Sequence, residues 1–127
     1  MKNLIEKFSK IEQEISKEKG DFEFFALFLR EDAIDKWDIV VAANWIKNNK
    51  WEVMQYVAGY VQRSLDVTEI VNISKIVIID EDNPELPMIQ NTFHIEHGAI
   101  EIKDYTFFGL SIKQAFIITS ASQKQLA

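Results

Sequence analysis

Four polar side chains that could take part in metal-dependent chemistry lie close together in the sequence: His94, Glu96, Glu101 and Lys103. An imidazole and two carboxylates that converge can bind a divalent metal ion. A lysine beside such an ion can stabilise negative charge or help to activate an attacking water. One hypothesis is therefore a metal site formed by His94, Glu96 and Glu101, with Glu101 and Lys103 as the catalytic residues.

The pattern around these side chains predicts a β-hairpin. Apolar and polar residues alternate from Phe93 to Lys103 on both sides of His97-Gly98, which suits a two-residue turn with positive φ. In that register His94 lies opposite Glu101, and the polar residues share the face opposite the apolar ones, Phe93, Ile95, Ile100 and Ile102. His94 and His97 match an H-x-x-H pattern. Residues three apart on a strand point to opposite faces, so His97 is not included among the predicted metal ligands.

Glu101-Ile102-Lys103 resembles the E-x-K element of the PD-(D/E)xK nucleases. The resemblance covers three residues, and the family's proline-aspartate step has no match upstream, because Pro84 is followed by glutamate. It implies that Glu101 holds Mg²⁺ or Mn²⁺ while Lys103 assists the attacking water. The function implied is a divalent-metal-dependent hydrolase that acts on phosphodiesters or on a small phosphorylated substrate.

The structural alternative is a solvated hairpin face. A cross-strand contact between His94 and Glu101 and a Glu–Lys pair would each contribute at most ~1 kcal/mol. We favour this alternative, because a three-residue match arises readily in a chain rich in glutamate and lysine.

Length and composition limit the other classes. The 127 residues predict one domain, 1–127, and the absence of cysteine excludes a thiol nucleophile and a thiolate metal site. A formal net charge of −6 disfavours nucleic acid as a partner. The N-terminus lacks the apolar core of a signal peptide, and no apolar run approaches the ~20 residues that cross a bilayer. We therefore expect a soluble cytoplasmic protein with no membrane partner and a frayed tail at residues 120–127.

Amphipathic spacing predicts two main helices. The first spans residues 2–18, with a stripe of Leu4, Phe8, Ile11 and Ile15. The second runs from about residue 50 to 65. Its core stripe is predicted to consist of Trp51, Met54, Val57, Ala58, Val61 and Leu65. A second, aromatic stripe beside it consists of Val53, Tyr56 and Tyr60. A glycine in the middle of this helix, Gly59, indicates close approach by another backbone.

Apolar runs at residues 22–29 and 37–43 predict two neighbouring strands buried on both faces. The charged link between them is too short for a parallel crossover, so they should be antiparallel. Residues 73–79 form a further strand after the long helix, which should run parallel to 37–43. The acidic segment 80–84 that follows fits a loop and helix start with Asn83 as N-cap, and a Mg²⁺ site is the alternative.

The predicted fold is α/β, on the border of α+β. A short helix and three further strands should follow residues 73–79, which gives a mixed sheet of about six strands packed with the N-terminal helix and the long central helix. Antiparallel pairs would flank the parallel pair, so a doubly wound sheet is disfavoured.

The surplus of aromatic residues favours a non-enzymatic role. Trp37, Trp45, Trp51, Tyr56 and Tyr60 cluster in a short part of the chain, and aromatic side chains are enriched at the cores of protein interfaces. Ordinary core packing is the alternative interpretation. We therefore expect a module that associates with itself or with another protein and needs no cofactor, with an interface of Trp45, Trp51, Tyr56 and Tyr60. The hydrolase with Mg²⁺ or Mn²⁺ is the alternative.

Overall fold

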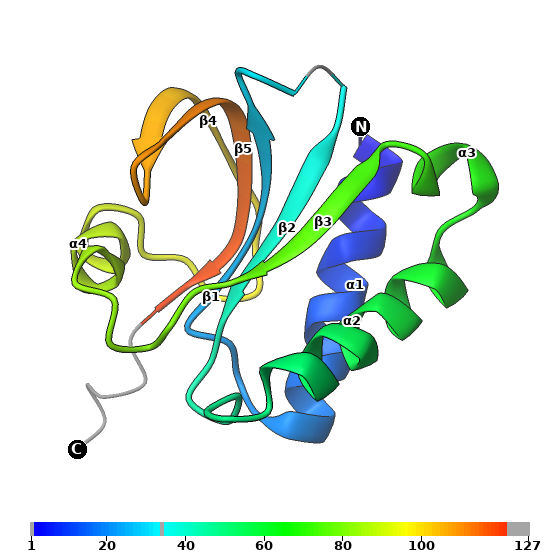
Figure 1. The fold of residues 1–127 in the computed structure, drawn as a ribbon, viewed down its shortest axis with the longest axis horizontal. Helices are drawn as coiled ribbons and strands as arrows, with labels where there is room; N and C mark the ends of the chain where they lie inside the picture. The colour runs from blue at the N-terminus through cyan, green and yellow to red at the C-terminus, as the bar shows by residue number, and fades with distance from the viewer. Residues whose placement is uncertain (1, 34, 122–127) are drawn as a thin grey trace.

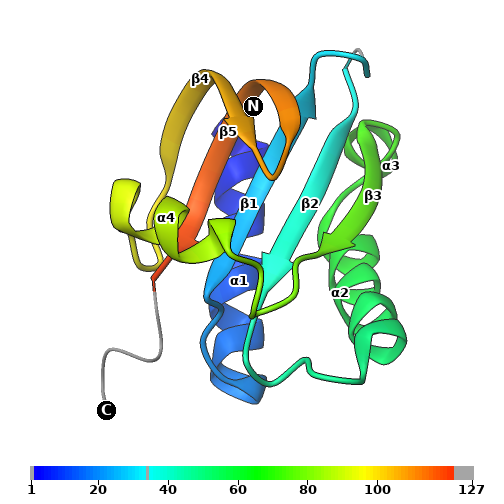
Figure 2. The ribbon, with the colours of Figure 1, turned by 60° about the vertical axis from the view of Figure 1, so that its left-hand side comes forward.

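A mixed sheet of five strands lies at the middle of the computed structural model, which describes residues 2–33 and 35–121. The strands are β1 (Phe24–Arg30), β2 (Trp37–Ala42), β3 (Ile73–Ile78), β4 (Ile100–Phe107) and β5 (Leu110–Ser120). Their order across the sheet is β3-β2-β1-β5-β4, as Figure 2 shows from one face. All neighbours are antiparallel except β2 and β3, which are parallel. The predicted mixed sheet is confirmed, but it has five strands instead of about six, and its parallel pair lies at one edge instead of between antiparallel pairs.

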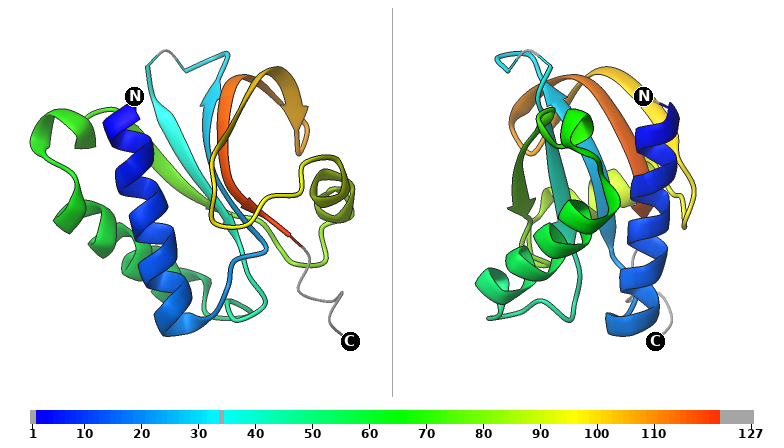
Figure 3. Two further views of the ribbon diagram at one scale, coloured as in Figure 1. Left: turned by 180° about the vertical axis from the view of Figure 1, so that it is seen from behind. Right: turned by 90° about the vertical axis from the view of Figure 1, so that its right-hand side faces the viewer.

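Helices cover both faces of the sheet and make three layers (Figure 1). The helices are α1 (Lys2–Lys19), α2 (Lys50–Ser64), α3 (Val67–Ile70) and α4 (Glu85–Thr92). Figure 3 shows α1 and α2 together on one side of the sheet, with α4 on the other. The α2 helix connects the parallel strands β2 and β3, as the strand–helix–strand pattern predicted. No helix among the described residues is long and apolar enough to cross a membrane.

The central strand β1 divides the core into two clusters. Phe25 and Leu27 face α1 and α2, while Phe24, Ala26 and Phe28 face α4, and all five are buried. Because both alternate sets of β1 side chains are apolar, the strand can be buried on both faces, which its sequence predicted. On the helix side, the α1 stripe packs against the sheet through Leu4, Phe8, Ile11 and Ile15.

The predicted hairpin at residues 93–103 is wrong. Its second half belongs to β4, which pairs with β5, and Ile100 lies opposite Ile117. Its first half forms only an isolated bridge, between Ile95 and Ser120, so both halves pair with the same strand instead of with each other. The alternation was informative about faces, because Ile95 and Ile100 do pack on the same cluster. It could not identify the pairing partner.

Between Ile95 and Ile100 the chain leaves the regular ladder but stays hydrogen-bonded to β5. His97 has a positive φ of 52°, and the N–H of Gly98 donates to the carbonyl of Ile118 over 2.9 Å. Residues 122–127 of the expected tail lie outside the described part of the chain. Ser120, which was expected to fray, is instead a buried residue at the end of β5.

Candidate functional site

The residues predicted to form a metal site lie on β4 and in the loop before it, and they form separate pairs. Nε2 of His94 lies 3.6 Å from Oε2 of Glu96. The side chain of Gln114, on β5, donates a hydrogen bond of 2.6 Å to Oε2 of Glu101, and Nζ of Lys103 lies 3.7 Å from the same oxygen. Within residues 2–33 and 35–121, no three His, Asp or Glu side chains are grouped so that they could hold a metal ion. The proposed ligands are therefore not brought together.

The most extensive polar cluster centres instead on Glu12, whose side chain is fully buried between α1 and β5. Its Oε1 atom lies 2.9 Å from Nδ1 of His97. Its Oε2 atom accepts hydrogen bonds from the hydroxyls of Thr119, over 2.9 Å, and Ser16, over 3.2 Å. Oγ1 of Thr119 also accepts the backbone N–H of His97 over 3.1 Å. The cluster therefore joins the loop before β4 to both α1 and β5.

The Glu12 carboxylate raises the pKa of His97 above its ordinary value, chiefly through their hydrogen bond. Partial burial opposes this rise, while the negative charges of Glu12, Asp21 and Glu96 support it. The other ring nitrogen, Nε2, lies 3.7 Å from Oδ1 of Asp21. His97 lines an open depression of about 440 Å³ on the surface beside Lys17. With a carboxylate beside each ring nitrogen, the imidazole of His97 links the loop before β4 to α1 and to Asp21.

Sequence reasoning missed this cluster, although α1 carried a signal for Glu12. Glu12 follows Phe8 by four residues and precedes Ile15 by three, so it lies on the apolar face of the helix. A carboxylate in that position must find hydrogen-bond donors or leave the core. The donors come from residues far along the chain, so sequence spacing could not identify them.

The aromatic residues expected at an interface divide into two groups. Trp45 donates its Nε1–H to the carbonyl of Gly20 over 3.0 Å, and the hydroxyls of Tyr56 and Tyr60 both donate to Glu18. The hydrogen bonds to Glu18 raise the pKa of Tyr60 and lower the pKa of Glu18. The pKa of Tyr56 is also raised, chiefly by burial and then by its hydrogen bond to Glu18. Tyr56 and Tyr60 therefore connect α2 to α1, while Trp45 connects the loop before α2 to the residue that follows α1.

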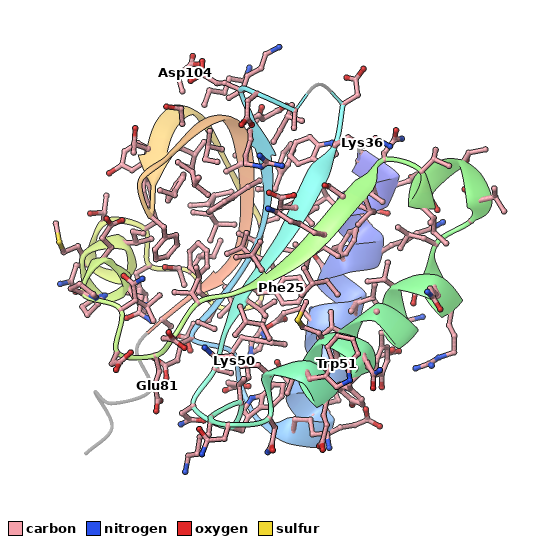
Figure 4. The ribbon with its side chains drawn as sticks, viewed as in Figure 1. Phe25, Lys36, Lys50, Trp51, Glu81 and Asp104 are labelled. Carbon is pink, nitrogen blue, oxygen red and sulfur yellow. The ribbon has the colours of Figure 1, made fainter. Side chains whose placement is uncertain are left out.

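Trp51 is the exception, because 69% of it is exposed. It was expected in the core stripe of α2, but the buried residues of that helix are Val53, Val57 and Val61. Val57 and Val61 belong to the predicted core stripe and Val53 to the aromatic stripe, so the buried face of α2 lies between the two and Trp51 is left in solvent. Figure 4 shows Trp51 on α2 beneath β3, near the C-terminal end of that strand.

The outer side of β3 is an unpaired sheet edge among the described residues, because β3 pairs only with β2. The N–H of Ile79 donates to the carbonyl of Val41 over 2.8 Å. Since successive strand residues direct their backbone groups to opposite sides, the N–H and C=O groups of Ile76 and Ile78 point away from β2. A strand from another chain could form hydrogen bonds with these groups.

Apolar side chains flank this unpaired backbone. A groove of about 240 Å³ lies between α2 and β3, and its lining includes Ala58, Val61, Ile73 and Ile76. Beyond the groove, Val67 and Val71 are 79% and 55% exposed, close to the start of β3. This surface, termed the β3 edge below, consists of the outer backbone of β3, the groove and three exposed side chains, Trp51, Val67 and Val71.

The other edge of the sheet has a different character. The β4 strand carries three charged residues, Glu101, Lys103 and Asp104, and all three are exposed. Charged side chains on an edge strand discourage pairing with other chains. The β3 strand carries a single charge, that of Lys75. The two edges therefore differ in how well they are protected against association.

The β3 edge and the Glu12 cluster are both features that the sequence did not reveal. Comparisons of the chain with protein-family models, with curated proteins and with solved structures found no match.

Proposed function

We propose that this protein is a non-enzymatic association module, which binds a partner by adding the partner's strand to the β3 edge. The observation that carries the proposal is the unpaired, weakly charged backbone of β3 beside an apolar groove. In this mode of recognition, main-chain hydrogen bonds supply affinity, and pockets for alternate side chains supply specificity.

Two physical features support the β3 edge as a binding surface. Its backbone is already fixed by pairing with β2, so only the incoming strand loses backbone freedom, at ~1–2 kcal/mol per residue. Trp51 offers a large apolar side chain at one end of the edge. Tryptophan is enriched among the residues that dominate binding energy at interfaces, because its burial removes much apolar surface from water.

A synthetic peptide with the sequence of residues 72–82 tests whether the edge accepts a strand. With a fluorescent label on the peptide, fluorescence anisotropy should show saturable binding to the wild-type protein. The same peptide with proline in place of Ile76 should not bind, because proline lacks an N–H and disfavours an extended ladder. Equal binding of the two peptides, or no binding of either, would contradict the proposal.

Two protein variants provide a matched comparison in the same assay. Trp51→Ser should weaken peptide binding, whereas Met88→Ser should not, because Met88 lies on α4 across the sheet. The two side chains are similarly exposed, 69% and 67%, so both variants should keep the wild-type free energy of unfolding within ~0.5 kcal/mol. A loss of binding in both variants would indicate that the peptide sticks to apolar surface in general.

A further inference from the structure

We infer that the strand received by the β3 edge comes from a second copy of this chain, paired antiparallel about a two-fold axis that passes close to Val77. The inference depends on the proposed function, because it names the partner of the same surface. It follows from the distribution of charge and of exposed apolar side chains along the β3 edge, whose two ends are complementary to each other.

The two ends of β3 carry opposite charges. At the N-terminal end, Lys36 donates from Nζ to the carbonyl of Val71, and Lys75 is exposed in the strand. Beyond the C-terminal end, Asp80, Glu81 and Asp82 follow in succession, all exposed, and Figure 4 places Lys36 and Glu81 at opposite ends of the sheet.

Local ion pairing leaves most of these charges uncompensated. Asp80 forms an ion pair with Lys50, at the start of α2. Within the described part of the chain, Lys75, Glu81 and Asp82 take part in no ion pair. A positive charge at one end of the edge and negative charges at the other are therefore available to a partner.

Antiparallel pairing of two copies brings these opposite ends together. The outward backbone groups of Ile76 and Ile78 fix the registers in which two β3 strands can exchange hydrogen bonds. If Ile76 of each copy lies opposite Ile78 of the other, Val77 lies on the axis and Lys75 lies opposite Ile79 of the second copy. Glu81 of that copy follows Ile79 closely, in the turn that begins at Asp80, so its long side chain lies at the same end of the paired strands as that of Lys75. Parallel pairing would instead place like charges side by side.

The same arrangement pairs the exposed apolar side chains. Trp51 lies on α2, near the C-terminal end of β3. Val67 lies on α3 and Val71 just after it, near the N-terminal end of β3. A two-fold axis perpendicular to the sheet keeps the helices of both copies on one face and reverses their direction. Trp51 of each copy therefore approaches Val67 and Val71 of the other. One rotation thus satisfies the backbone, charge and apolar requirements together, and it produces a continuous sheet of both copies.

Charge reversal tests this partner and this orientation. Sedimentation velocity should show that the wild-type protein forms dimers at tens of micromolar. Lys75→Glu alone and Glu81→Lys alone should each weaken the dimer by roughly tenfold, because like charges then meet twice across the axis. An equimolar mixture of the two variants should restore dimerisation, since a Glu–Lys pair then forms at both contacts. Lys103→Glu, on β4, is the matched control and should leave the dimer unchanged.

Each other outcome overturns the inference in a recognisable way. A wild-type dimer that ignores both reversals, or whose variants are not rescued by mixing, forms through another surface or another orientation. A protein that remains a strict monomer but binds the peptide of residues 72–82 has a β3 edge made for a different partner, which leaves the proposed function standing. A monomer that also fails to bind the peptide removes both proposals.

Discussion

Nδ1 of His97 lies 2.9 Å from Oε1 of Glu12, across the boundary between the loop before β4 and helix α1. This contact ties α1 to the irregular segment between the bridge at Ile95 and the start of β4 at Ile100. The charged strand β4 begins directly after this segment and pairs with β5. Because β4 occupies the edge beside β5, the edge that remains weakly protected is that of β3.

His97 should make the stability of the protein depend on pH. The pKa of His97 is raised in the folded state, so the folded protein holds this proton more tightly than the unfolded chain does. The resulting stabilisation should be complete below the unfolded value, about 6.5, and should be lost as the pH rises through the folded value. Urea unfolding from pH 5.5 to 9, in steps, should show the free-energy difference between wild type and His97→Gln shrinking as the pH rises. A difference that stays constant across this range would contradict the ion pair.

Thr119 provides a second test of the Glu12 cluster. Thr119→Val keeps the shape of the side chain but removes the hydroxyl that donates to Glu12 and accepts from the backbone of His97. Because Thr119 is buried, the variant should lose about 1–3 kcal/mol of unfolding free energy. Thr106→Val, at an exposed position on β4, is the control and should change the unfolding free energy by less than ~0.5 kcal/mol. Equal losses in both variants would mean that the hydroxyl of Thr119 has no special role.

Gly59, in the middle of α2, should tolerate alanine. A Cβ built at Gly59 meets only Nη1 of Arg63, at 3.2 Å, and no backbone, so the close backbone approach expected from sequence is not found within the described residues. Since the end of the arginine side chain can move, Gly59→Ala should raise the unfolding free energy by about 0.5–1 kcal/mol, as measured by urea titration. A destabilised variant would show that Gly59 packs against something, which a second copy could supply.

The arrangement of β1, β2 and β3 could be predicted from the sequence, because hydrophobic periodicity and the lengths of the connections leave few alternatives there. Runs that are apolar on both faces and rich in phenylalanine or β-branched residues favour interior strands over buried helices. The short link at residues 30–36 then requires β1 and β2 to be antiparallel. The connection through α2 likewise forces β3 to be parallel to β2. These constraints are local or topological, so one sequence is enough to recognise them.

The predictions were wrong where the structure of a segment depends on which other segment it packs or pairs with, because the sequence pattern of the segment does not show this. Alternation around His97 describes two strand-like pieces, but it cannot show that β5 is long enough to pair with both. In α2, two adjacent apolar stripes compete, and only packing against the sheet decides that Val53 is buried and Trp51 is exposed. The buried role of Glu12 depends on Thr119, more than 100 positions later, as their sequence separation of 107 shows.

Backbone hydrogen exchange at Ile76 and Ile78 tests the central claim most directly, because these amides point outward from the β3 edge. Exchange rates should be measured by NMR on dilute wild-type protein, with and without excess peptide of residues 72–82. Strand addition at this edge predicts that both amides slow markedly with the peptide, while the outward amides of β4 are unchanged. Unchanged exchange at Ile76 and Ile78, or protection that appears on β4 instead, would contradict the claim that β3 is the binding edge.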